Sequence, residues 1–132
     1  MIAVLDTHVL VAAVITEGIC ARILRRARER EFELAVCPFI LAELEAVLTR
    51  KFSASKREVS ETIALVREAA TLIVEHVSEV RGVCRDRDGD NILACALAAR
   101  SDYLGTGDDD LLVVRRFHNT QIIPPRAFEI LF

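Results

Sequence analysis

Short, mostly apolar segments alternate along this chain with longer segments of helical periodicity, and this alternation restricts the possible fold more than any other feature. Short apolar runs of this kind are typical of strands buried on both faces of a sheet. Strands that are joined through helices run parallel, and the helices cover both faces. The pattern therefore predicts a three-layer α/β/α sandwich with a central, mainly parallel sheet of about five strands. The expected strands are residues 1–5, 34–37, 71–75, 103–106 and 121–123.

The segments between these strands contain the expected helices. Apolar residues three and four positions apart indicate helical faces, and Pro38 stands where the first residue of a helix is expected. One helix has two candidate caps, Ser55 and Ser60, and both remain open. Residues 78–90 are polar and are expected to form a loop. The expected helices are residues 8–15, 17–32, 39–51, one that ends near residue 70, 91–100, 108–117 and a short one that opens at Pro124 or Pro125.

Length and charge restrict the classes of function. A chain of 132 residues is expected to form one domain, residues 1–132. A net charge of -3 excludes a strong overall attraction to nucleic acid, and an aromatic content of 5% argues against a stacking platform for single strands. The four cysteines lack the spacing of a zinc site, and no segment is apolar enough to span a membrane. We therefore expect a cytoplasmic protein with no membrane partner.

Two aspartates follow the predicted strands closely. Asp6 comes directly after the first strand, and Asp108 follows the fourth strand after Gly107. Because ligands of open parallel sheets bind beyond the carboxyl ends of the strands, both side chains are candidates for a binding site. An aspartate in either place is also an ordinary helix cap, so position alone does not decide its role.

Further acidic candidates lie on the predicted helices. Glu43 and Glu45 both have apolar neighbours three and four positions away, so periodicity leaves open which of them faces the sheet. Asp90 opens the most apolar helix of the chain, where capping of the helix by Asp88 or Asp90 is the alternative interpretation.

A metal ion is the expected consequence if these carboxylates converge. Two unit charges ~4 Å apart repel by about 4 kcal/mol at an effective dielectric constant near 20. A divalent cation relieves this repulsion, and all-oxygen ligands suit Mg²⁺ or Mn²⁺. Such an ion activates water for attack on a phosphodiester. The sequence therefore predicts a site for Mg²⁺ (or Mn²⁺).

Three segments of the chain, VLDTHVLVAA, AELEAVLTRKF and DRDGDNILACALAARSDYLGTGDDDLL, carry a family resemblance. They resemble the PIN domain, a family of metal-dependent nucleases, and above all its small prokaryotic members that are ribonuclease toxins of toxin–antitoxin systems. The resemblance favours Glu43 over Glu45, because the family's acid directly precedes the leucine matched here by Leu44. It implies that the catalytic, metal-binding acids are Asp6, Glu43, Asp90 and Asp108, that Asp110 is a further metal ligand, and that Thr7, Thr106 and Asp86 support the site.

The resemblance also implies a function and partners. It implies a Mg²⁺- or Mn²⁺-dependent ribonuclease that hydrolyses RNA phosphodiester bonds and leaves 5′-phosphate and 3′-hydroxyl ends. The implied partners are RNA, a cognate antitoxin protein and a second copy of the chain in a homodimer or higher homo-oligomer. The alternative is a PIN-fold metal-binding protein that acts as a non-catalytic partner of nucleic acid or protein.

Other residues are expected around the site. His8 stands where the family usually has Asn or Ser, and it would bond Asp6, lie at the rim of the pocket or face solvent. Because RNA must approach an acidic pocket, basic residues are expected nearby, and the candidates are Arg85, Arg87, Arg115 and Arg116. Arg22, Arg25, Arg26 and Arg30 on the second helix are further candidates for RNA contact, although a solvated helix face is the favoured interpretation of these four.

Overall fold

The computed structural model describes residues 1–132, and its centre is one six-stranded sheet with the strand order β3-β2-β1-β4-β6-β5. The strands are β1 (Ile2–Leu5), β2 (Glu33–Val36), β3 (Ala70–Ile73), β4 (Tyr103–Gly105), β5 (Arg116–Phe117) and β6 (Thr120–Ile123). All neighbouring strands are parallel except β5, which runs antiparallel to β6 at the edge of the sheet. The predicted mainly parallel α/β/α architecture is confirmed, with six strands instead of about five.

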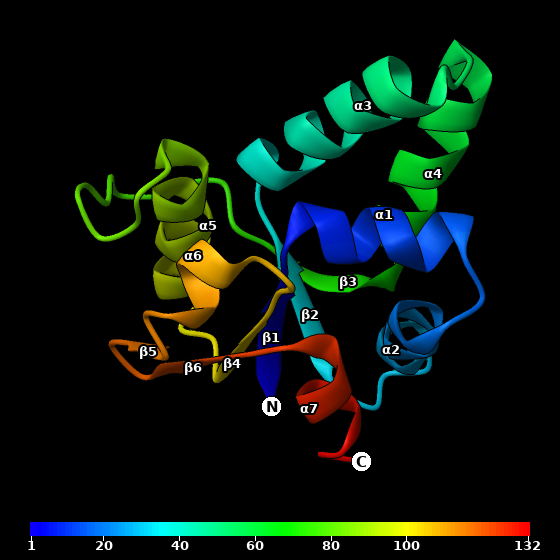
Figure 1. Ribbon diagram of the computed structural model, residues 1–132. Helices are drawn as coiled ribbons and strands as arrows, with labels where there is room; N and C mark the ends of the chain where they lie inside the picture. The colour runs from blue at the N-terminus through cyan, green and yellow to red at the C-terminus, as the bar shows by residue number, and fades with distance from the viewer.

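Seven helices flank this sheet. They are α1 (Thr7–Ile15), α2 (Ile19–Arg28), α3 (Pro38–Phe52), α4 (Lys56–Ala69), α5 (Arg87–Ala98), α6 (Asp109–Leu112) and α7 (Pro125–Glu129). Figure 1 shows α5 and α6 on one side of the strands and α1, α2 and α7 on the other. The central strands β1, β2 and β4 are buried over most of their length between these helices, which explains why their sequences are mainly apolar.

The core lies between the sheet and these helices. Every residue of β1 after Ile2 is buried, and so are the last three residues of β2. Helix α5 is buried over most of its circumference, as its continuous apolar sequence predicts. At the other end of the chain, the fully buried Phe128 of α7 packs edge-on against Phe32 and Tyr103.

The prediction of a helix over residues 108–117 is wrong beyond Leu112. Helix α6 has only four residues, and the chain then reverses into the β5–β6 hairpin. Arg115 and His118 adopt positive φ values of 67° and 54°, which end the helix and turn the chain. Helix α5 begins at Arg87, earlier than expected, because the Asp86 side chain accepts a hydrogen bond from the Asp88 backbone N–H and caps it.

The order of the strands places the expected site. The chain leaves β1 for β2 on one side of the sheet, whereas β4 and β6 lie on the other side of β1. The strand order therefore reverses between β1 and β4, and a crevice at the carboxyl ends of two such strands is the usual ligand site of an open parallel sheet. The backbone N–H of Asp6, directly after β1, donates to the carbonyl of Gly105 at the end of β4 at 2.9 Å.

No single helix is both long and apolar enough to cross a membrane. Helices α1 and α2 meet such a criterion of length and composition only as a pair, and they are bent by 97° relative to each other.

The structure decides between the two candidate caps of α4. The Ser55 side chain accepts a hydrogen bond from the Glu58 backbone N–H, and the Glu58 carboxylate accepts one from the Ser55 N–H, which forms a capping box. We expect Ser55→Ala to lower the free energy of unfolding by about 1 kcal/mol in urea denaturation. The matched control is Ser60→Ala within the exposed face of α4, for which we expect a change within about 0.5 kcal/mol. Equal effects of the two substitutions would contradict the capping role.

Candidate active site

The side chain of Thr106 joins the carboxyl ends of β1 and β4. Its hydroxyl donates to Asp6 Oδ2 at 2.7 Å and accepts from the Asp108 backbone N–H at 3.0 Å. Thr106 is fully buried, and Asp6 is only 4% exposed. One hydroxyl therefore fixes both the Asp6 carboxylate and the backbone that carries Asp108, although the two aspartates are remote in sequence.

Asp6 also caps helix α1. Its Oδ1 atom accepts a hydrogen bond from the His8 backbone N–H at 3.4 Å. The imidazole of His8 lies beside the same oxygen, with 3.8 Å between Nδ1 and Oδ1, and is 62% exposed. His8 therefore lies at the rim of the site, one of the three positions left open by the sequence.

Helix α3 brings Glu43 to the same end of the sheet. Glu43 is half-buried, whereas Glu45 is exposed, so the ambiguity between them is settled by burial. Burial is the main cause of a raised pKa at Glu43. A hydrogen bond with the Thr7 hydroxyl lowers this pKa, whereas the charge of Asp88, a hydrogen bond with Asp88 and the charge of Asp6 raise it further. Glu43, Asp6 and Asp88 are thus close enough to influence one another's charge.

The acidic residues of α5 have three different environments. Asp86 caps the helix, and Asp88 is exposed and lies within hydrogen-bonding reach of Glu43. Asp90 is 6% exposed, and its carboxylate accepts hydrogen bonds from the backbone N–H groups of Gly82, Val83 and Cys84 at 2.9, 3.2 and 2.7 Å. Asp90 therefore faces the loop that precedes α5, and Asp88 is the residue of this helix that lies beside Glu43.

The first turn of α6 carries three consecutive aspartates. Asp108 and Asp109 are exposed, Asp110 is half-buried, and Asp108 Oδ1 accepts from the Asp110 backbone N–H at 2.9 Å. The thiol of Cys84 lies near acids of both helices. Burial raises its pKa to about 11, and the charges of Asp90 on α5 and of Asp108 and Asp110 at α6 contribute to this rise. Sequence reasoning missed Cys84 and the influence of Asp88 on the pKa of Glu43, since both depend on how the loop before α5 folds.

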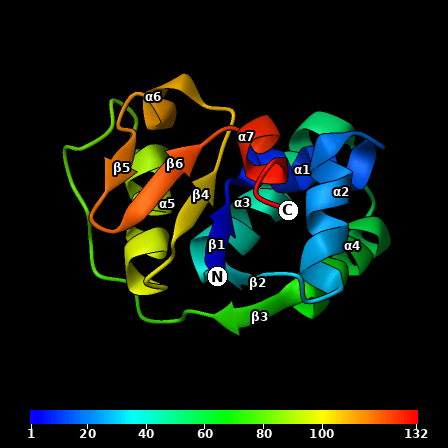
Figure 2. The same ribbon diagram turned by 90° about the horizontal axis from the view of Figure 1, so that it is seen from below.

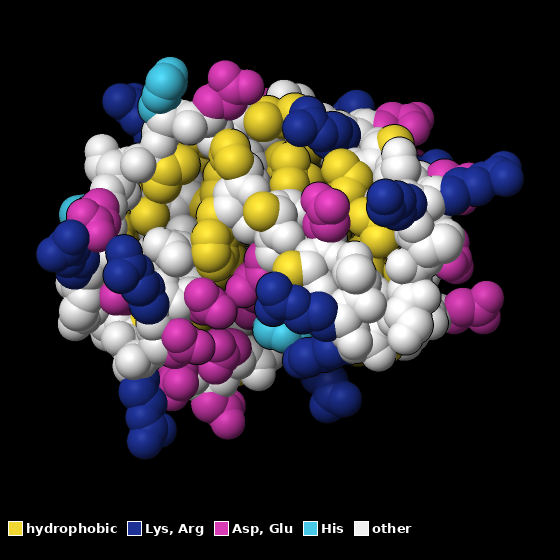
Figure 3. All heavy atoms as spheres, turned by 90° about the horizontal axis from the view of Figure 1, so that it is seen from above, with side chains coloured by type: hydrophobic (Ala, Val, Ile, Leu, Met, Phe, Trp, Pro, Cys, Tyr) yellow, Lys and Arg dark blue, Asp and Glu magenta, His cyan; other side chains and the backbone are white.

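None of these acids is paired with a lysine or arginine. All ion pairs formed by arginine involve other acids, namely Glu31, Glu61, Glu79 and Glu129. Figure 3, which shows the face seen from above, has acidic side chains gathered in one area. The local negative charge is therefore not balanced by the protein itself.

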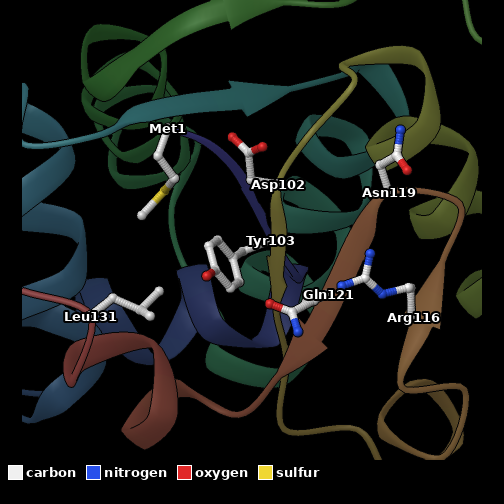
Figure 4. Close-up of a pocket in the computed structure, with 7 residues that line it drawn as sticks. All are labelled: Met1, Asp102, Tyr103, Arg116, Asn119, Gln121 and Leu131. Atoms are coloured by element: carbon white, nitrogen blue, oxygen red, sulfur yellow. The ribbon is translucent and has the colours of Figure 1, made fainter.

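The arginines expected near the site are distributed unevenly. Arg85 and Arg87 are exposed in the loop and first turn of α5, and Arg87 Nη2 lies 3.7 Å from Glu79 Oε1. Arg115 is exposed in the turn after α6. Arg116 lies elsewhere, because it lines a cavity of about 500 Å³ that contains none of the candidate acids. Figure 4 shows this cavity, where Tyr103, Gln121 and Arg116 stand side by side on β4, β6 and β5.

The arginines of the second helix have mostly structural partners. Arg22 and Arg26 pair with Glu129 of α7, and Arg26 also pairs with Glu31. Arg30 donates to the carbonyls of Glu68 and Ala69. These contacts give Arg22, Arg26 and Arg30 a structural role and weaken the hypothesis that they bind RNA. Arg22 and Arg26 tie α2 to α7, and Arg30, just after α2, binds the end of α4. Figure 2 shows α2 beside both of these helices.

The donors at the site fit a hard divalent cation by their chemistry. Carboxylates from β1, α3, α5 and α6 are oxygen ligands of the kind that Mg²⁺ and Mn²⁺ prefer. The hydroxyl oxygen of Thr7, fully buried next to Asp6, forms no hydrogen bond of normal length and angle. The structure contains no group of three or more His, Cys, Asp or Glu side chains that could hold a metal ion in their present positions. The ligands would thus need to draw together around an ion.

Comparisons with known proteins bear on the family and the fold of the chain. Residues 3–110 match the family model described as PIN domain. No curated protein sequence matches the chain significantly. Among solved structures, a chain of the crystal structure of VapBC2 from Rickettsia felis, bound to a DNA fragment from their promoter, superposes with a TM-score of 0.67. That superposition covers 92% of this chain and 97% of the other at 18% identity, so it shows a shared fold.

The environment of Glu43 predicts a specific dependence of stability on pH. Because its pKa is raised, the folded chain retains a proton at pH values where the unfolded chain has lost it, so stability falls as the pH rises from the ordinary glutamate value. We expect Glu43→Gln to remove this loss. The free energy of unfolding of the variant relative to the wild type should increase between pH 4 and pH 7.

The control is Glu45→Gln, which changes an exposed carboxylate on the same helix. Its difference from the wild type should not vary over this pH range. A pH-independent difference between Glu43→Gln and the wild type would contradict the assigned environment.

Proposed function

Since this chain belongs to the PIN domain family, we propose that it is a Mg²⁺- or Mn²⁺-dependent ribonuclease that acts as the toxin of a toxin–antitoxin pair. On this proposal residues 1–132 form a single nuclease domain in the cytoplasm. The reaction is hydrolysis of RNA phosphodiester bonds to 5′-phosphate and 3′-hydroxyl ends, as the resemblance to the small PIN toxins implies.

The observation that supports the proposal most is the set of carboxylates without a basic partner at the carboxyl ends of β1 and β4. Asp6 is almost fully buried, and Glu43 is half-buried beside it. Burial of uncompensated carboxylates is costly, and natural proteins accept this cost mainly at functional sites. A cation from solution would balance the charge that no lysine or arginine balances.

The proposed ligands are Asp6, Glu43 and Asp108, a carboxylate from the first turns of α5, for which the resemblance suggests Asp90, and Asp110 as an accessory ligand. Bound there, the ion would supply positive charge at the scissile phosphate and promote ionisation of the attacking water. Thr106 holds Asp6 in place through the hydrogen bond to Oδ2, which fixes one ligand before substrate arrives.

RNA would approach this acidic site beside the loop that precedes α5. Arg85 is exposed in that loop and forms no ion pair with any acid, so its guanidinium is free to contact a phosphate. Arg87 and Arg115 are further candidates. Arg116 supports such a role less, because it faces the cavity shown in Figure 4.

A non-catalytic role is the alternative function. In that case the fold would serve as a partner for nucleic acid or protein without cleavage.

The proposal extends to protein partners. The structural relative was crystallised as VapBC2 with promoter DNA. By analogy we propose that this chain binds a cognate antitoxin protein and forms a homodimer or higher homo-oligomer.

Substitution of the acids tests the catalytic proposal. We expect Asp6→Asn and Asp108→Asn to reduce Mn²⁺-dependent cleavage of a set of structured RNAs to the level seen with EDTA, because each change removes a charged ligand. The matched control is Asp109→Asn, which removes an exposed carboxylate next to Asp108 and should retain most of the activity.

Two results would count against this function. Cleavage by both variants at the wild-type rate would contradict the assigned roles. RNA binding without any cleavage by the wild type, in Mg²⁺ or Mn²⁺, would favour the non-catalytic alternative.

The role of Arg85 is tested by the dependence of RNA binding on salt. The logarithm of the RNA-binding constant falls linearly with the logarithm of the salt concentration. Each phosphate contact that is lost reduces the steepness of this fall by about 1. We expect this change for Arg85→Ala but not for Arg57→Ala, which removes an exposed arginine paired with Glu61 on α4. Equal slopes for the wild type and both variants would exclude contact by Arg85.

A further inference from the structure

The loop between β3 and α5 folds back against the beginning of α5. It leaves the sheet after Ile73 and reaches Asp86, the cap of α5, without forming a helix or strand. Gly82 adopts a positive φ of 71°, and the turn there directs the following residues toward the helix. Figure 1 shows this segment as a wide excursion beside α5.

The Asp90 carboxylate holds the returning part of this loop. Its Oδ2 atom accepts from the Gly82 N–H, and its Oδ1 atom accepts from the N–H groups of Val83 and Cys84. Both oxygens are therefore occupied by backbone donors. Hydrogen bonds from backbone N–H groups stabilise a buried carboxylate without a metal ion.

A close approach at Gly89 shows how tightly the loop is seated. A Cβ atom at this position would lie 2.9 Å from both Cβ and Sγ of Cys84. Glycine at this position therefore allows the side chain of Cys84 to come this near the first turn of α5. Asp88 lies in the same turn, between the Asp86 cap and the residues in contact with the loop.

We propose that Asp90 is a positioning residue, which anchors residues 82–84 and thereby sets Asp88 beside Glu43 as the carboxylate that α5 contributes to the metal site. This inference rests on the proposed function and deepens it. It exchanges the roles of two aspartates that lie two residues apart. The Asp88 carboxylate is exposed and accepts no hydrogen bond from a backbone N–H group, whereas backbone N–H groups of the loop occupy both oxygens of Asp90.

The experiment is a double-mutant cycle in the full chain with Mn²⁺ alone as the probe. We expect Asp88→Asn and Asp90→Asn each to weaken Mn²⁺ binding roughly 10-fold or more in calorimetric titration. If Asp90 acts through Asp88, adding Asp90→Asn to the Asp88→Asn variant weakens Mn²⁺ binding little further. Amide hydrogen exchange of residues 82–84 should accelerate at least about 10-fold in Asp90→Asn and remain unchanged in Asp88→Asn.

A second variant avoids reliance on a buried charge. Gly89→Ala leaves both carboxylates intact but forces the loop away from α5 through the contact with Cys84. It should reproduce the loss of Mn²⁺ binding and the faster exchange of residues 82–84. Again, the effect on Mn²⁺ binding should disappear in the Asp88→Asn background.

The possible outcomes separate this inference from the proposed function. Losses that add fully in the double variant would identify Asp90 as an independent ligand and overturn the inference, as would unchanged exchange of residues 82–84 in Asp90→Asn. A chain that binds Mn²⁺ but cleaves no RNA would contradict the proposed function while the cycle still decides the role of Asp90. A wild-type chain that binds no Mn²⁺ would overturn both.

Discussion

The hydrogen bonds of one buried hydroxyl organise the candidate site of this protein. Thr106 links the Asp6 carboxylate after β1 to the backbone of Asp108 after β4. These two strands pair side by side at the point where the strand order reverses. The chain can form this link only after the crossover through α5 has brought β4 beside β1. The site is therefore a product of long-range folding, and local sequence contributes mainly the choice of side chain at each strand end.

Electrostatics explains why the carboxyl ends of β1 and β4 would favour binding of a cation. The arginines that form ion pairs do so with other acids; Arg22 and Arg26, for example, tie α2 to Glu129 and Glu31. The acids at the ends of β1 and β4 have only the imidazole of His8 nearby. The raised pKa values of Glu43 and Cys84 follow from burial and from neighbouring carboxylates. A divalent ion would relieve the repulsion between these carboxylates.

The sequence predicted the strands, the layers and the ends of the sheet well, because short apolar runs between amphipathic helices leave few alternative folds. It did not predict the β5–β6 hairpin, whose turn depends on left-handed backbone at Arg115 and His118. Periodicity left Glu43 and Glu45 equivalent, and burial separates them. The different surroundings of Asp88 and Asp90 were beyond sequence reasoning, since they depend on where an irregular loop returns to its helix.

The central claim is that carboxylates from β1, α3 and α6, remote in sequence, share one divalent cation. The most direct measurement is anomalous diffraction from crystals of the chain grown with Mn²⁺. The claim predicts one principal peak within coordination distance of oxygens from Asp6, Glu43 and Asp108, roughly 2.0–2.3 Å for ions of this class. A fully occupied peak elsewhere, or well-ordered side chains at these positions with no peak at saturating Mn²⁺, would contradict it.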